Sequence, residues 1–235
     1  ELIVNIIASL SGNTEIALGN VVGSNIFNIL FILGLSALFV PLLVHKQIIQ
    51  MDVPIMIVAS IMLWISAHFG TLGFWTGMIY FSLMIAYTAF IIYQAKKAKK
   101  QEANDYEKNY QLKEPFSWKA ILKDMSWIVI SLIILVIGSQ MLVKGSVSLA
   151  QLLGVSELVI SLTIIAAGTS FPELATSIVS AMRGQRDIAV GNIVGSNIYN
   201  IWATLGLSSI LAPEGIPVPE SALSFDIPVM VAATI

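Results

Sequence analysis

The chain has 235 residues, of which 57% are hydrophobic and 11% charged, whereas ordinary soluble domains have roughly 45–50% apolar and about 25% charged residues. The net charge of −2 excludes the basic surface by which proteins bind nucleic acid, and the absence of cysteine excludes disulfides, thiolate metal sites and cysteine nucleophiles. Thirteen of the 26 charged residues lie between Lys96 and Asp124, so the other 206 positions cannot build a water-facing surface. The composition predicts an all-α protein that crosses a membrane several times.

Six apolar runs have lengths suited to membrane-spanning helices. The second is short, and Asp52 followed by Pro54 resembles a helix start that fixes its first turn. The chain begins with Glu1 rather than Met and its last apolar run stops after 11 residues, so we expect a segment of a longer protein. The predicted spans are residues 16–43, 53–67, 72–93, 125–143, 155–182 and 188–211, with partial spans at both ends.

The polar stretch 95–124 holds eight of the twelve Lys and Arg residues. Short positive loops stay in the cytoplasm, and alternation of the spans then leaves only Lys144 outside. We interpret the stretch as a solvated cytoplasmic linker rather than a binding site for lipid headgroups. The expected division is a first unit 1–94, the linker 95–124 and a second unit 125–235.

The two units contain the same sequence twice. Residues 1–37 match residues 173–209 at a constant offset of 172, with 19 of 37 positions identical, and Asp52-Val53-Pro54 recurs as Asp226-Ile227-Pro228. The span that holds Glu173 is the fifth after the one that holds Glu1, so the second copy is expected to run in the opposite direction. Inverted repeats are typical of secondary transporters, in which two halves enclose a site near the membrane midplane.

Residues 166–173, Ala-Ala-Gly-Thr-Ser-Phe-Pro-Glu, place a carboxylate within a predicted span, which costs on the order of 2.5–3.5 kcal/mol. Because Pro172 has no N–H to donate to the carbonyl of Gly168, the helix is expected to break there and expose backbone oxygens. Glu173, Thr169, Ser170 and freed carbonyls form an all-oxygen set suited to hard cations such as calcium.

The next helix carries polar residues spaced by four, which therefore share one face. We interpret Ser24, Asn28, Ser196 and Asn200 as site candidates because they are duplicated beside the two glutamates. The G-x-x-x-G pairs on the same helices are interpreted as helix packing. The amides expected to tie helices together are Asn20, Asn25, Asn192 and Asn197.

Two carboxylates at a pseudo-two-fold axis carry a charge of −2, which one divalent cation, or monovalent ions or protons, would balance. Ions that compete for the same carboxylates cannot all bind at once, so release of one on one side of the membrane lets another load. Such competition between ions is how an antiporter couples their transport. The residues alone do not identify the counter-ion.

At these motifs the sequence strongly resembles the sodium/calcium exchangers, especially the compact prokaryotic members. The second copy of their signature is complete, from Gly168 to Asn200, and the first runs from Glu1 to Asn28. The resemblance implies ten helices in the longer protein, of which this chain holds about helix two to part of helix nine, in a plasma or inner membrane. It also implies sodium and calcium as substrates, without a cofactor or an obligatory protein partner.

The resemblance further implies a role for each matching residue. Glu1 and Glu173 would be the main calcium ligands, with the backbone carbonyl of Thr169 beside them. Ser170, Ser196 and the Ala166 carbonyl would form one sodium site that adjoins Thr169, Ser24 would belong to its mirror image, and Asn28 and Asn200 would line the centre. The motif that should precede Glu1 is absent, so this segment alone is not expected to transport. Neutral Asn28 and Asn200 argue against potassium dependence.

The nearest alternative is the same fold that exchanges calcium, or another divalent ion, for protons. A calcium channel could use acidic residues, but it has no need of inverted broken helices. An intramembrane enzyme is not expected, because His45 and His68 lie near span ends without a nucleophile close in sequence, and Asp52 and Asp226 are interpreted as helix caps.

Overall fold

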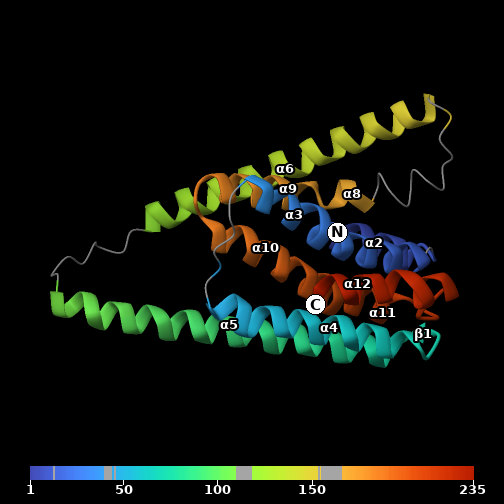
Figure 1. Ribbon diagram of the computed structural model, residues 1–235, viewed down its shortest axis with the longest axis horizontal. Coiled ribbons are helices and arrows are strands. Elements are labelled where there is room, and N and C mark those ends of the chain that lie inside the picture. Colours follow the sequence, from blue (N-terminus) through green and yellow to red (C-terminus); the bar gives the residue numbers. More distant parts are fainter. Residues whose placement is uncertain (13, 40–43, 45, 110–117, 153, 155–165) are drawn as a thin grey trace.

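A computed structural model describes residues 1–12, 14–39, 44, 46–109, 118–152, 154 and 166–235, and this part of the chain is mostly helical (Figure 1). The elements are α1 (Leu2–Leu10), α2 (Thr14–Ile26), η1 (Phe27–Leu33), α3 (Gly34–Phe39), η2 (Ile48–Asp52), α4 (Val53–Ala67), β1 (Thr71–Leu72), α5 (Phe74–Asn109), α6 (Trp118–Leu152), α8 (Ala166–Thr169), α9 (Phe171–Met182), α10 (Arg186–Tyr199), η4 (Asn200–Leu205), α11 (Gly206–Leu211), β2 (Ile216–Pro217), η5 (Ala222–Asp226) and α12 (Ile227–Thr234), where η denotes a π-helical segment.

The helices lie in layers around a central group. Figure 1 shows α4 and α5 along one side of the molecule and α6 along the opposite side, with α2, α10, α11 and α12 between them. α5 packs against α11 and α4 packs against α12, while α10 contacts α9, α4 and α2. The buried apolar core therefore joins α2, α4, α10, η4 and α12, and includes Leu18, Leu63, Ile198, Ile201 and Met230.

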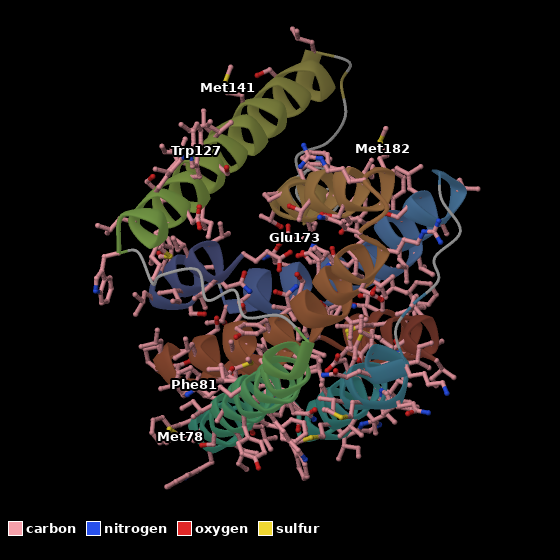
Figure 2. The ribbon with its side chains drawn as sticks, turned by 90° about the vertical axis from the view of Figure 1, so that its left-hand side faces the viewer. Met78, Phe81, Trp127, Met141, Glu173 and Met182 are labelled. Atoms are coloured by element: carbon pink, nitrogen blue, oxygen red, sulfur yellow. The ribbon has the colours of Figure 1, made fainter. Side chains whose placement is uncertain are left out.

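Within the described ranges, three helical stretches are long and apolar enough to cross a membrane: Ala17–Leu38, Ile48–Ala67 and Phe74–Lys97. Large apolar side chains also cover the outside of the molecule, and Figure 2 shows Trp127, Met141 and Met182 at its periphery with Glu173 near the centre. Lipid rather than water is the solvent for such a surface, since monomeric soluble proteins rarely expose extended apolar patches.

The second predicted span proves longer than expected, and the interpretation of Asp52 as a cap that begins it is wrong. Its helix passes through the π-helical η2, Asp52 has helical backbone angles and no capping hydrogen bond, and the Tyr87 hydroxyl donates to Asp52 Oδ1 at 3.1 Å. Asp226 likewise lies inside a continuous helix, between η5 and α12, and caps nothing. A π turn shifts the hydrogen-bond register, so each helix continues through the proline two residues later despite its missing N–H.

The other predicted runs correspond to helices where the structure describes them. α6 covers 125–143, and α10, η4 and α11 together cover 188–211. α5 and α6 also extend into the polar stretch 95–124, which is helical up to Asn109 and again from Trp118. Of the fifth run, residues 155–165 lie outside the described residues.

A short two-stranded sheet joins two turns at one end of the molecule. β1 and β2 pair antiparallel, with Thr71 opposite Pro217 and Leu72 opposite Ile216. Gly215 has φ +75°, and a Cβ added there would lie 2.9 Å from the Leu72 carbonyl oxygen. Glycine is therefore required at this turn, which ties the α4–α5 connection to the segment after α11.

Candidate cation site

The helix around Pro172 breaks where the sequence predicts. α8 ends at Thr169, Ser170 has non-helical angles of φ −96° and ψ 3°, and α9 begins at Phe171 with the proline in its first turn. The Ser170 amide donates to the Ala167 carbonyl at 3.1 Å, a tight turn in place of an α-helical bond. The break places Glu173 in the first turn of α9, where the positive end of the helix dipole favours a negative charge.

Glu1 and Glu173, which the sequence places 172 residues apart, line one cavity. Its volume is about 450 Å³, and Figure 2 shows Glu173 near the centre of the molecule. Ser170 Oγ donates to Glu1 Oε1 at 2.9 Å, whereas the buried Glu173 Oε2 has no hydrogen-bond partner among the described residues. The lining consists of Glu1, Leu2, Glu173, Gly191, Asn192, Gly195, Ser196, Tyr199, Asn200 and Thr204.

Among the described residues that line the cavity, two glutamates and no lysine, arginine or histidine contribute a charged side chain. No group of three or more histidine or acidic side chains comes together within the described ranges. The remaining lining oxygens belong to neutral amides and hydroxyls of α10 and η4. Two carboxylates surrounded by neutral oxygens suit a hard cation such as calcium or sodium.

A chain of polar contacts joins α8 to α2 beside the cavity. Ser24 Oγ lies 3.5 Å from Thr169 Oγ1, which in turn donates to Asn20 Oδ1 at 3.2 Å. Asn20 Nδ2 donates to Asn5 Oδ1 at 2.8 Å. These contacts place Ser24 beside Thr169, whereas Ser24 was expected in the mirror image of the sodium site that adjoins Thr169. Ser24 is fully buried and is absent from the cavity lining.

Four asparagines from α2, η1, α10 and η4 form a reciprocal cluster. Asn28 Nδ2 donates to Asn197 Oδ1 at 2.9 Å, and Asn200 Nδ2 donates to Asn25 Oδ1 at 3.0 Å. Asn25 and Asn197 each donate to the backbone carbonyl of the other at 3.3 Å. The expectation that Asn25 and Asn197 tie helices together is confirmed. Asn200 lines the cavity, whereas Asn28 is buried within the cluster.

Other polar contacts also occur in pairs at the offset of 172. Asn192 Nδ2 donates to Ser177 Oγ at 3.0 Å, at the positions that correspond to Asn20 and Asn5. Asn5 Nδ2 donates to the Ala17 carbonyl oxygen at 3.4 Å, and Ser177 Oγ donates to the corresponding Ala189 carbonyl oxygen at the same distance. The two copies of the sequence therefore make the same local contacts.

Some residues that line the cavity were not predicted from the sequence, and others were assigned a different role. Gly191 and Gly195, which were interpreted as helix packing, also line the cavity. A Cβ added at Gly191 would lie 3.7 Å from Ile48 Cδ1 of η2, an ordinary packing distance. Tyr199 and Thr204 were not predicted; Thr204 continues the spacing of four from Asn200, a signal that could have identified it. Ala166 begins α8, and its side chain lies outside the described residues.

These features define a membrane cation transporter, and comparison with known proteins gives the family. The family model described as "Sodium/calcium exchanger protein" matches residues 1–93 and 123–235. The chain belongs to the sodium/calcium exchanger family, whose members are antiporters rather than enzymes.

Relatives and solved structures agree with this membership. The chain is 36% identical to a putative antiporter, CaxA, of Alkalimonas amylolytica over its whole length and 72% of the relative. It is 37% identical to the inner membrane protein YrbG of Escherichia coli, over all of this chain and 71% of that protein, and 31% identical to the sodium/calcium exchanger MaX1 of Methanosarcina acetivorans, over 75% of that protein. Its fold matches the solved sodium-calcium exchanger NCX_Mj with a TM-score of 0.79 and 25% identity, over 99% of this chain and 71% of that one.

Proposed function

We propose that the protein containing this chain exchanges sodium for calcium across the membrane, with the cavity between Glu1 and Glu173 as its cation site. The observation that carries this proposal is the pairing of two glutamates from two copies of one motif in a cavity whose described lining holds no cationic side chain. A buried carboxylate without a partner is costly. A bound cation removes that cost, and the two negative charges of Glu1 and Glu173 balance the charge of one calcium ion.

The proposed ligand assignment is the one that the resemblance to the sodium/calcium exchangers implies, and the chemistry of the oxygens is compatible with it. Glu1, Glu173 and the Thr169 carbonyl would hold calcium, which takes about 6–8 oxygen ligands. Sodium would use the neutral oxygens of Ser170, Ser196 and the Ala166 carbonyl, and Ser24 on the mirrored side. Asn28 and Asn200 would complete the centre.

Alternating access would follow from two inverted units that rock around the site. The hydrogen bonds repeated at an offset of 172 support two equivalent units. The span of Glu173 is the fifth after that of Glu1, and this odd step supports their inversion. The cytoplasmic side would be that of the linker 95–124, by the positive-inside rule. Because calcium and sodium need the same carboxylates, only one of them loads at a time.

Calcium-45 uptake into proteoliposomes that hold the full-length protein tests the proposal. The vesicles are preloaded with sodium, potassium or choline, with and without an imposed pH gradient. We expect uptake only with internal sodium. Uptake driven only by the pH gradient would replace sodium by protons as the counter-ion, and calcium flux without any counter-ion would indicate a channel.

Replacement of Ser196 by alanine separates the roles of the two cations. The substitution leaves both carboxylates in place but removes a neutral oxygen from the cavity lining. We expect the half-saturating sodium concentration to rise about threefold or more, the effect of losing one polar contact, with a smaller change for calcium. Ser60→Ala is the control, because Ser60 is buried in α4 and donates to Met56. An unchanged sodium response in Ser196→Ala would remove this residue from the site.

A further inference from the structure

The polar face of α10 continues one turn beyond the family motif. Asn192, Ser196, Asn200 and Thr204 follow one another at a spacing of four, and all four line the cavity. Thr204 lies in the π-helical η4, where a turn holds more than four residues, so it stays nearly in line with Asn200. Its side chain is only 4% exposed.

The corresponding position in the first copy has no hydroxyl. An offset of 172 pairs Thr204 with Ile32, which is fully buried in η1. Asn192, Ser196 and Asn200 all have identical counterparts, Asn20, Ser24 and Asn28. The two halves therefore present different chemistry one turn beyond the central asparagines.

The Thr204 hydroxyl is available to a ligand. Ser60, Thr88 and Thr176 each donate to the carbonyl four residues earlier, at 2.8–3.0 Å, which is the usual way for a helix in an apolar medium to satisfy a hydroxyl. Thr204 makes no such bond with any described residue. Thr204 lines the cavity and its hydroxyl has no hydrogen-bond partner among the described residues, so the hydroxyl can contact what the cavity holds.

Buried polar side chains continue beyond Thr204. Gly206 and Ile210 face α5, because a Cβ on Gly77 of α5 would lie 2.6 Å from Gly206 O and 2.9 Å from Ile210 N. Ser208 is two residues from each of them, so it lies on the side of α11 that faces away from α5. Helix α1 also packs against α11. Its hydroxyl is fully buried and has no partner within the described part of the chain.

The size of the cavity leaves room for a cation to contact Thr204. A volume of about 450 Å³ equals about fifteen water volumes, far more than one dehydrated ion needs. We infer that Thr204 is a further cation-contacting residue, whose hydroxyl extends the site from Asn200 toward α11. This inference rests on the proposed cation site and gives the second half a ligand that the first half lacks.

Cation-dependent thermal stabilisation of the full-length protein in detergent tests this inference without requiring transport. The midpoint of unfolding is measured against calcium and sodium concentration for Thr204→Val, which removes the hydroxyl at constant size, and for Thr204→Ser, which keeps it. We expect the apparent Kd of at least one cation to rise about three- to tenfold in Thr204→Val, as for one lost polar contact, and to stay within about twofold in Thr204→Ser.

The control is Thr234→Val, because Thr234 is a buried threonine of α12 whose hydroxyl donates to Val231. It should lower stability without changing either apparent Kd. Equal cation affinities in the wild type and Thr204→Val would refute the role of Thr204 while leaving the two-glutamate site intact. A wild type that no cation stabilises would refute the cation site itself, and the inference with it.

Discussion

Replacement of Glu173 by glutamine in the full-length protein is expected to abolish calcium transport while the protein remains folded. Glu173 lines the cavity, and its buried Oε2 has no hydrogen-bond partner among the described residues. The amide preserves shape but removes the charge that attracts the cation, so uptake should fall by about a hundredfold or more. Calcium-45 uptake into sodium-loaded proteoliposomes measures this loss.

Stability measurements distinguish loss of the site from loss of the fold. Without cations, Glu173→Gln should melt at or above the wild-type temperature, because a neutral side chain is cheaper to bury. Calcium should then no longer raise the melting temperature. Glu220→Gln is the control, since Glu220 is exposed between β2 and η5, and it should transport normally. Near-normal uptake by Glu173→Gln would contradict the assignment.

Replacement of Gly77 by alanine is expected to give the largest loss of stability. A Cβ there would lie 2.6 Å from the Gly206 carbonyl oxygen and 2.9 Å from the Ile210 amide nitrogen. Both are backbone atoms that cannot rotate away, so α5 and α11 must separate. Overpacking of this kind costs about 1–3 kcal/mol, which corresponds to a melting temperature lower by about 2–12 °C.

Gly73→Ala is the matched control for Gly77→Ala. Gly73 lies one turn earlier, and a Cβ there meets no described atom within 4 Å. Thermal unfolding of both variants in detergent should therefore separate them clearly. Transport by Gly77→Ala should also weaken, because α11 directly continues η4, which carries Asn200 and Thr204. A Gly77→Ala protein that melts like the wild type would show that the helices are less tightly packed than described.

Spacing in the sequence predicts which residues share a helix face, but it does not show what that face meets. Ser24 and Ser196 occupy the same position of the repeated motif, yet Ser196 lines the cavity and Ser24 is buried against Thr169. The G-x-x-x-G pair at Gly191 and Gly195 is typical of helix contacts, and here it also forms part of the cavity wall. Only the neighbouring helices decide between these outcomes.

Local signals were also misleading where the backbone hydrogen bonding is unusual. Asp52 and Pro54 together resemble a helix start, but η2 carries the helix through them. A π turn leaves no clear mark in the hydrophobic pattern, because it changes the register by one residue without changing which residues are apolar. The same holds for Asp226 before Pro228.

The sequence by itself determined that this chain is a helical membrane protein, that one motif occurs twice, and that Glu1 and Glu173 are equivalent. Lipid imposes apolar spans of a set length, and a costly carboxylate within a span marks a functional position, so these features can be read directly. Tertiary structure alone decided that the two glutamates line one cavity, that Asn25 and Asn197 form hydrogen bonds with each other, and that Thr204 belongs to the cavity lining. Those contacts join residues up to 203 positions apart, and no local pattern encodes which helices pack together.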